Sequence, residues 1–435
     1  MSTLAGSFAR GVRAPAAPPL TLSDRLFLAG LLLALAMVAD PFGWRLERVL
    51  LTKHLPLFIA CAGALLTLCG TVLFPPAWQM RRGAARPAGS VLATTWPLLV
   101  LALWSIAGSL FARRVLDIHN TFLGMGLYML FALLVARVIV VCAARERLIA
   151  IWLWGATLAA AWMVLGWATG LSDARGAWHE MENLVIPLAL WHGLAPARAG
   201  WPRRGRLALM AVFLAAGVLL QKYTGLIVLA ITLAWMWWAG RGAARADASP
   251  CVRRPGRALR AGVAGATGAL LVAGALATLA MLRGNVLPQS NNLYRLTTYE
   301  TAWRGFLAAP VFGAAFTGAA TARFTGFDIE AARGVLPTHS DVLDIAAQGG
   351  TLGLLLWFAG NLRIARLAGR RLLRPRPAGH PRALGHTLAC MVATGVVVYT
   401  FNPIMLQPVK ALILWTELGM LVGLALATPI DAERP

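Results

Sequence analysis

The chain has few charged residues, few acidic residues and few cysteines. Charged residues make up 13% of its 435 positions, about half of the roughly 25% that is usual in soluble globular proteins. Asp and Glu number 17, against 40 Lys and Arg. The 5 cysteines include no CxxC pair and are not spaced as a disulfide framework. These shortages exclude a disordered chain, a coiled coil and a disulfide scaffold, and they argue against a soluble protein.

Apolar residues are abundant instead, at 59% of the chain, and the mean hydropathy is +0.68. Because a membrane helix needs roughly 20 apolar residues, the runs of such residues predict about twelve crossings. They lie near 24–40, 55–74, 95–112, 121–142, 148–168, 183–196, 206–221, 223–240, 260–282, 341–362, 384–401 and 409–428. The fold class expected is therefore all-α, as a single polytopic membrane domain over residues 1–435.

Lys and Arg are concentrated in alternate loops, which sets the predicted orientation. With the N-terminus inside, the inner segments hold roughly twice as many of them as the outer segments, as the positive-inside rule requires. Both termini are then cytoplasmic, and the first apolar run is a retained helix rather than a cleaved signal. The net charge of +23 follows from this topology, so it does not indicate a nucleic-acid partner.

One outer segment, 283–340, is far longer than the other loops. Apolar residues at helical spacing between Leu293 and Phe306 predict a membrane-surface helix over about 291–308. A long ordered loop outside the cytoplasm is where an enzyme acting there would hold its active site. We therefore expect the chemistry to lie in or beside this loop.

His339 is the candidate catalytic residue. Thr338 and Asp341 fit a capping box before an apolar run, which predicts His339 in the first turn of a membrane helix. The positive end of that helix would favour a bound phosphate and keep the imidazole neutral, able to accept a proton. The alternative is a simple helix cap with an interfacial histidine. No third ligand has convincing spacing for a metal beside His339 and Asp341.

Polar residues continue along the same predicted helix. Asp341, Asp344, Gln348 and Thr351 are spaced to form one stripe. Ionisable groups in a membrane segment usually face the bundle interior or a wet cavity. The other interpretation places both aspartates near the headgroups, where charge costs little.

Cationic residues on the outer side are the candidate phosphate ligands. Arg295 lies on the predicted surface helix, and a guanidinium group matches phosphate oxygens bidentately. Lys222 lies in the polar break Gln221–Thr224 between two apolar runs. Either side chain could instead be solvated or contact lipid headgroups. Further possible substrate contacts on the outer side are Arg113, Arg114, Arg175 and His179.

The chain has no Walker, Rossmann or nucleophile-elbow motif. Without a nucleotide site, the energy for a reaction must come with the substrate. We therefore expect no cofactor.

The region 283–362 resembles the bacterial O-antigen ligases of the ligase/polymerase superfamily. Their outer loop runs into a helix with the pattern H-[NSQ]-x9-G-x-x-[GTY], which reads His339-Ser340 and then Gly350-Thr351-Leu352-Gly353 here. Arg295, Trp303 and Pro310-Val311-Phe312-Gly313 look like the arginine, tryptophan and P-x-x-G of the family's loop. Where family members commonly carry Ser-Arg, this chain has Gln221-Lys222, which keeps the charge but loses the bidentate fork.

The resemblance implies an inner-membrane glycosyltransferase with a periplasmic active site. It would transfer O-antigen polysaccharide from undecaprenyl pyrophosphate to lipid A–core oligosaccharide, inverting the anomeric carbon without a metal. In this interpretation His339 is the general base, and Arg295 and Lys222 hold the pyrophosphate.

Two alternatives remain open from the sequence. A polysaccharide polymerase would use the same donor, and the R-x10-G pattern associated with polymerases occurs at Arg113…Gly124 and Arg323…Gly334, although matches are expected by chance in a glycine-rich chain. A secondary transporter would use the stripe at Asp344 and Gln348 as a proton path. Against a transporter, the sequence offers few ionisable groups at mid-membrane and no evident internal repeat.

Overall fold

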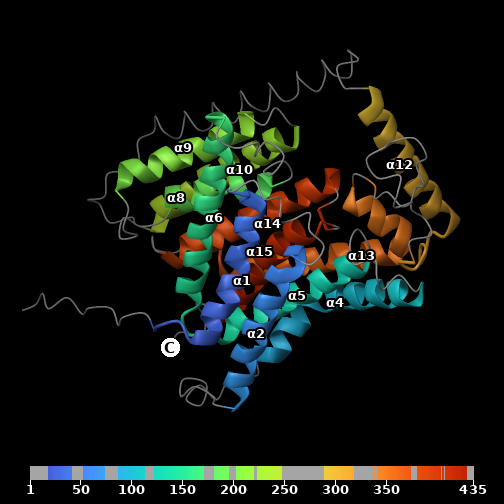
Figure 1. The fold of residues 1–435 in the computed structure, drawn as a ribbon, viewed down its shortest axis with the longest axis horizontal. Helices are drawn as coiled ribbons and strands as arrows, with labels where there is room; N and C mark the ends of the chain where they lie inside the picture. Colours follow the sequence, from blue (N-terminus) through green and yellow to red (C-terminus); the bar gives the residue numbers. More distant parts are fainter. Residues whose placement is uncertain are drawn as a thin grey trace, which may run out of the picture.

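The computed structural model describes most of the chain. The described residues are 18–41, 52–73, 87–112, 122–170, 181–194, 202–219, 223–246, 289–317, 338, 340–373, 380–402, 404–405 and 407–428. Within them every regular element is a helix (Figure 1). The expected all-α architecture is thus confirmed.

The helices follow the predicted apolar runs closely. They are α1 (Leu22–Ala39), η2 (Thr52–His54), α2 (Leu55–Leu73), α4 (Pro87–Phe111), α5 (Phe122–Val141), α6 (Arg145–Ala168), α7 (Glu182–Val185), α8 (Leu188–Leu194), α9 (Arg203–Leu219), α10 (Tyr223–Ala246), α12 (Gln289–Ala308), α13 (Asp341–Arg371), α14 (His380–Phe401) and α15 (Pro408–Ala427). Eight of the described helices are long and apolar enough to cross a membrane. The predicted run 260–282 lies outside the described residues.

One predicted run is divided, for a local reason. The run 183–196 forms the short helices α7 and α8, separated by a turn at Ile186 and Pro187, whose ring nitrogen cannot donate a helical hydrogen bond. The predicted separation of the runs 206–221 and 223–240 agrees with the structure, in which α9 ends at Leu219 and α10 begins at Tyr223. Neither half of the 183–196 run is long enough to cross a membrane by itself.

Helix α15 is the centre of the bundle. Of its 18-residue apolar window 89% is buried, against 28% for α2. It packs closely on α5 through Gly419 and Gly423, because a Cβ on Gly419 would come within 2.5 Å of the Ala132 carbonyl oxygen, and one on Gly423 within 2.7 Å of that of Ala136. This is the small-xxx-small contact common between membrane helices.

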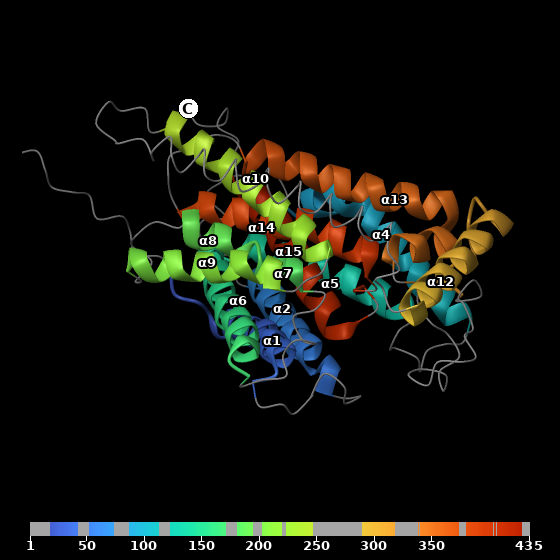
Figure 2. The ribbon, with the colours of Figure 1, turned by 90° about the horizontal axis from the view of Figure 1, so that it is seen from above.

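The α12 helix lies away from this centre. Figures 1 and 2 place it at one edge of the molecule beside α13, at the opposite end of the long axis from α8 and α9. Its bounds, Gln289–Ala308, match the helix predicted over 291–308. Of the predicted site residues, Arg295 lies on α12, and Asp341 and Asp344 lie on the first part of α13.

Candidate functional site

Only part of the predicted site falls in the described structure. Asp341 and Asp344 are described in full, and Arg295 lies on α12, although its side chain is not described. The remaining predicted site residues, His339, Lys222, Arg113, Arg114, Arg175 and His179, lie outside the described residues. The geometry that follows concerns the described residues of α12, α13 and the segments that contact them.

The N-terminus of α13 differs from the predicted capping box. Ser340 is the N-cap, and its hydroxyl accepts a hydrogen bond from the Leu343 N–H at 3.3 Å. The helix begins at Asp341, so the prediction that it includes residue 339 in its first turn was wrong. Thr338 is not the N-cap. Its hydroxyl donates a hydrogen bond to the Ser340 carbonyl at 2.6 Å and so stabilises the segment before the helix.

Both predicted aspartates are buried, with 1% of Asp341 and 3% of Asp344 exposed. Asp341 Oδ2 accepts the Ile404 N–H at 2.9 Å and the Met405 N–H at 3.0 Å, in the connection between α14 and α15. Asp344 Oδ1 accepts the Thr338 N–H at 3.3 Å. This burial favours the interpretation that both aspartates face the interior of the bundle over the interpretation that they lie among lipid headgroups. Since two carboxyl groups already lie at the positive end of α13, a pyrophosphate would need cationic side chains rather than this helix end.

α13 is broken at Gly350, which has φ 58° and ψ −158° within an otherwise helical run. The break frees backbone groups, and the turn that follows α12 binds them. The Ala347 and Gln348 carbonyls accept the Ala314 and Phe316 N–H groups at 3.0 and 3.2 Å. The Thr351 and Leu352 N–H groups donate to the Pro310 and Val311 carbonyls at 2.8 and 3.1 Å. We call these two paired segments, 310–317 and 347–352, the clamp.

Two glycines make the clamp possible. Gly313, like Gly350, has φ 58°, a conformation that side-chain-bearing residues rarely adopt. A Cβ on Gly350 would lie 2.5 Å from the Val311 carbonyl carbon and oxygen, and one on Gly313 would lie 2.5 Å from the Gln348 carbonyl carbon. Gly313 of the P-x-x-G motif and Gly350, the first glycine of the G-x-x-G motif, are thus required by the mutual approach of the two backbones.

Phe316 anchors the clamp in the bundle. It is 1% exposed and makes edge contacts with Trp104 of α4 and Phe122 of α5 at centroid distances of 5.3 and 5.7 Å. A Cβ on Gly108 of α4 would overlap the Ala315 carbonyl oxygen, so only glycine admits this approach. The clamp therefore fixes α12 and the first part of α13 against two membrane helices.

An exposed apolar surface runs from α12 into the turn. Trp303, Leu307, Val311 and Phe312 are each more than half exposed, and Trp303 stacks on Phe306 with centroids 5.3 Å apart. On the same helix the exposed Arg304 pairs with Glu300 at 2.5 Å. Tryptophan beside charged groups is typical of a membrane–water interface, which agrees with the predicted surface helix.

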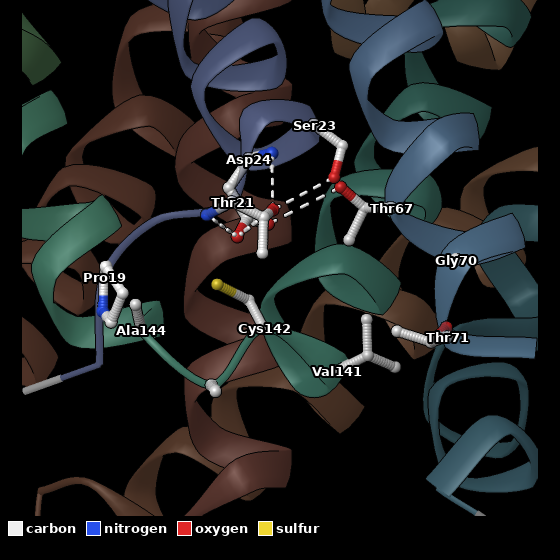
Figure 3. Close-up of a pocket in the computed structure, with 11 residues that line it drawn as sticks. Pro19, Thr21, Ser23, Asp24, Thr67, Gly70, Thr71, Val141, Cys142 and Ala144 are labelled. Carbon is white, nitrogen blue, oxygen red and sulfur yellow. Dashed lines mark hydrogen bonds between the residues drawn. The ribbon is translucent and has the colours of Figure 1, made fainter. Parts of the chain in front are cut away.

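A pocket lies at the other end of the molecule, between the start of α1, the end of α2 and the turn after α5 (Figure 3). Asp24 lines it, but its carboxylate accepts the Thr21 N–H and hydroxyl at 3.0 and 2.6 Å as a capping box. Burial, followed by the nearby Asp24 charge, raises the pKa of the Cys142 thiol to about 12, so it is not a thiolate at neutral pH. The pocket therefore offers no reactive group.

Sequence reasoning missed a polar cluster inside the bundle. Glu417 of α15 accepts a hydrogen bond from the Asn183 side-chain amide at 2.9 Å, and the adjacent Glu182 accepts one from the Thr224 hydroxyl at 3.1 Å. Both carboxyl groups are 0% exposed. The available signal was Glu417 itself, the one acidic residue of the apolar run 409–428.

Among the described residues, no group of three or more His, Cys, Asp or Glu side chains is arranged to hold a metal ion. No known family model matches this chain, and no characterised protein sequence is significantly similar to it. The functional argument therefore depends on the motifs and on the geometry that joins them.

Proposed function

We propose that the chain is a membrane-embedded glycosyltransferase of the O-antigen ligase type. It transfers O-antigen polysaccharide from undecaprenyl pyrophosphate to lipid A–core oligosaccharide at the periplasmic face of the inner membrane. The partners in this proposal are the lipid-linked donor, the lipid A–core acceptor and the bilayer, with no cofactor and no nucleic acid.

One observation carries the proposal. Two sequence motifs that resemble the ligase family, Pro310–Gly313 and Gly350–Gly353, are paired through their backbones in the clamp. The first segment of the clamp directly follows α12, which carries Arg295. The second segment lies shortly after His339 in the sequence. Motifs that matched by chance would have no reason to meet at glycines with the same unusual φ.

The proposed chemistry is a single displacement. The acceptor hydroxyl loses its proton to His339 as its oxygen attacks the anomeric carbon, and the bond from that carbon to the pyrophosphate oxygen breaks. Arg295 and Lys222 neutralise the charge that develops on the departing undecaprenyl pyrophosphate. The configuration at the anomeric carbon is inverted, and the lipid-linked pyrophosphate supplies the energy.

The exposed apolar surface of α12 supports a lipid-borne substrate. Trp303, Leu307 and Phe312 would sit at the bilayer interface, the depth at which the pyrophosphate of a polyprenyl donor lies. The clamp holds this surface and the start of α13 in one fixed arrangement, which a displacement between two anchored lipids requires.

A matched pair of histidine variants tests the base. His339→Ala is expected to lower the rate of transfer by about 10²–10⁴-fold, the usual contribution of a general base. His380 begins α14, so His380→Ala removes a histidine from another helix start and should leave transfer near the wild-type rate. Equal activity of the two variants would refute the base role of His339, and so would loss of His339→Ala protein from the membrane fraction.

A second pair tests the arginine. Arg295→Ala should reduce transfer severely, and Arg295→Lys should recover part of it, because lysine keeps the charge but lacks the bidentate geometry. Arg304→Ala on the same helix is the control, since Arg304 is exposed and paired with Glu300. Full activity of Arg295→Lys would show that only charge matters there.

A secondary transporter is the second candidate, and the buried cluster of Glu182, Asn183 and Glu417 favours it. Ionisable groups deep in a bundle often mark ion or proton pathways. This cluster answers the objection that the bundle interior has few such groups. Transport would appear as substrate accumulation in proteoliposomes under an imposed proton gradient, without any glycan transfer.

A further inference from the structure

Glu417 lies near the middle of α15, the most buried of the eight spanning helices described. Its side chain is 0% exposed. An ionised carboxylate in such surroundings needs a cation or several hydrogen-bond donors to replace lost hydration. The environment of Glu417 therefore decides its charge.

That environment supplies one donor. The Asn183 amide donates to Glu417 Oε2 at 2.9 Å, whereas Oε1 is buried and has no hydrogen-bond partner in the part of the chain that the structure describes. Within the described part of the chain Glu417 makes no ion pair. Titratable groups on the helices packed on α15 include Tyr128 and Arg137 of α5, Asp341 and Asp344 of α13, and His386, Cys390 and Tyr399 of α14. Glu182 adjoins Asn183 on α7. None of them bonds to its carboxyl group.

We propose that Glu417 is a proton-binding site in the membrane interior, with the proton on Oε1 and Oε2 acting as the carbonyl oxygen that accepts from Asn183. A neutral acid needs no counter-ion, and the single amide donor satisfies its carbonyl. The proposal does not depend on the glycosyltransferase function.

Asn183 connects Glu417 to another part of the bundle. Its side-chain amide donates to Glu417 of α15, while the adjacent Glu182 accepts from the Thr224 hydroxyl of α10. A neutral Glu417 accepts the Asn183 bond without placing an uncompensated charge in the interior.

Infrared difference spectroscopy of the full-length protein in proteoliposomes tests this site. The wild-type spectrum at neutral pH should contain a carbonyl stretch of a protonated carboxyl group that shifts in D₂O and is absent from Glu417→Gln. Glu182→Gln is the matched control and should keep the band. In Asn183→Leu the band should move to higher frequency, because the carbonyl loses its hydrogen bond.

The proposal fails if the wild type lacks the band, or if Glu417→Gln retains it. It also fails if adding sodium or potassium ions raises the melting temperature of the wild type but not of Glu417→Gln, since that would identify a bound metal cation in place of the proton. If Glu417→Gln does not accumulate, the D₂O shift in the wild type and the frequency change in Asn183→Leu decide the question.

Discussion

The clamp is a partly exposed region and the Glu417 cluster is a buried one, and the two satisfy their hydrogen bonds differently. In the clamp, the break at Gly350 frees carbonyls and N–H groups, and four backbone hydrogen bonds from 310–317 take them up. At Glu417 a single side-chain bond satisfies one oxygen, and the other has no hydrogen-bond partner among the described residues.

This difference separates a rigid region from an exchangeable one. Four backbone hydrogen bonds between the two segments of the clamp hold them in a defined arrangement, as positioning of substrates requires. A carboxyl group with an open oxygen can instead gain or lose a proton without breaking backbone structure. The clamp is thus suited to hold a catalytic geometry, and the cluster is suited to hold a proton.

Phe316→Ala should have the largest effect on the clamp. It removes a fully buried ring from between Trp104 and Phe122, and loss of a buried Phe costs about 3–5 kcal/mol. Thermal unfolding of the purified protein in detergent measures it. Phe312→Ala is the control, because Phe312 is 58% exposed. Equal melting temperatures for the two variants would contradict the anchoring role of Phe316.

Gly350→Ala should be the next most damaging change. The backbone conformation alone costs about 1–3 kcal/mol for a residue with a side chain, and the added Cβ would meet Val311. Limited proteolysis should then cut between α12 and α13 sooner than in the wild type. Gly369→Ala serves as the control on the same helix, because its Cβ would meet nothing within 4 Å. A wild-type proteolysis pattern for Gly350→Ala would show that α13 does not need its break.

Thr351→Val should have a smaller effect. It removes the hydrogen bond from the Thr351 hydroxyl to the Pro310 carbonyl, which measures 2.8 Å and is exposed, so about 0.5–1.5 kcal/mol is expected. The backbone bond between the same residues remains. A loss as large as that from Phe316→Ala would mean that the side chain, and not the backbone, holds the clamp.

Glu417→Gln should shift the melting temperature least. Glutamine has the shape of a protonated glutamate and keeps an oxygen that can accept from Asn183. The comparison between the two regions predicts that substitution of Glu417 by Gln changes the melting temperature little, whereas substitutions in the clamp lower it. A strong destabilisation at neutral pH would indicate that Glu417 carries a charge, which would reverse the comparison.

Much of the fold could be predicted from the sequence, because apolar runs of about 20 residues specify membrane helices directly. The surface helix at 289–308 and the break between α9 and α10 also followed from local patterns. The orientation in the membrane and the total number of crossings stay predictions.

The clamp could not be predicted, because its two segments are more than thirty residues apart and pair through the backbone, which leaves no side-chain pattern. The sequence identified Gly350 as part of the ligase-like motif but did not predict the break in α13 at this residue. The cap of α13 was misplaced because Thr338 and Ser340 are both good N-caps, and the choice depends on the long-range bonds of Asp341 to residues 404 and 405. Glu417 was missed because its partner, Asn183, comes from a distant helix.

Transfer by the purified protein tests the central claim most directly. The protein is reconstituted with an undecaprenyl-pyrophosphate-linked glycan, in the presence or absence of lipid A–core. The proposal predicts glycan joined to lipid A–core only when that acceptor is present, with release of undecaprenyl pyrophosphate and without nucleotide. Longer lipid-linked chains formed without the acceptor would identify a polymerase and contradict the account, and so would the absence of any transfer.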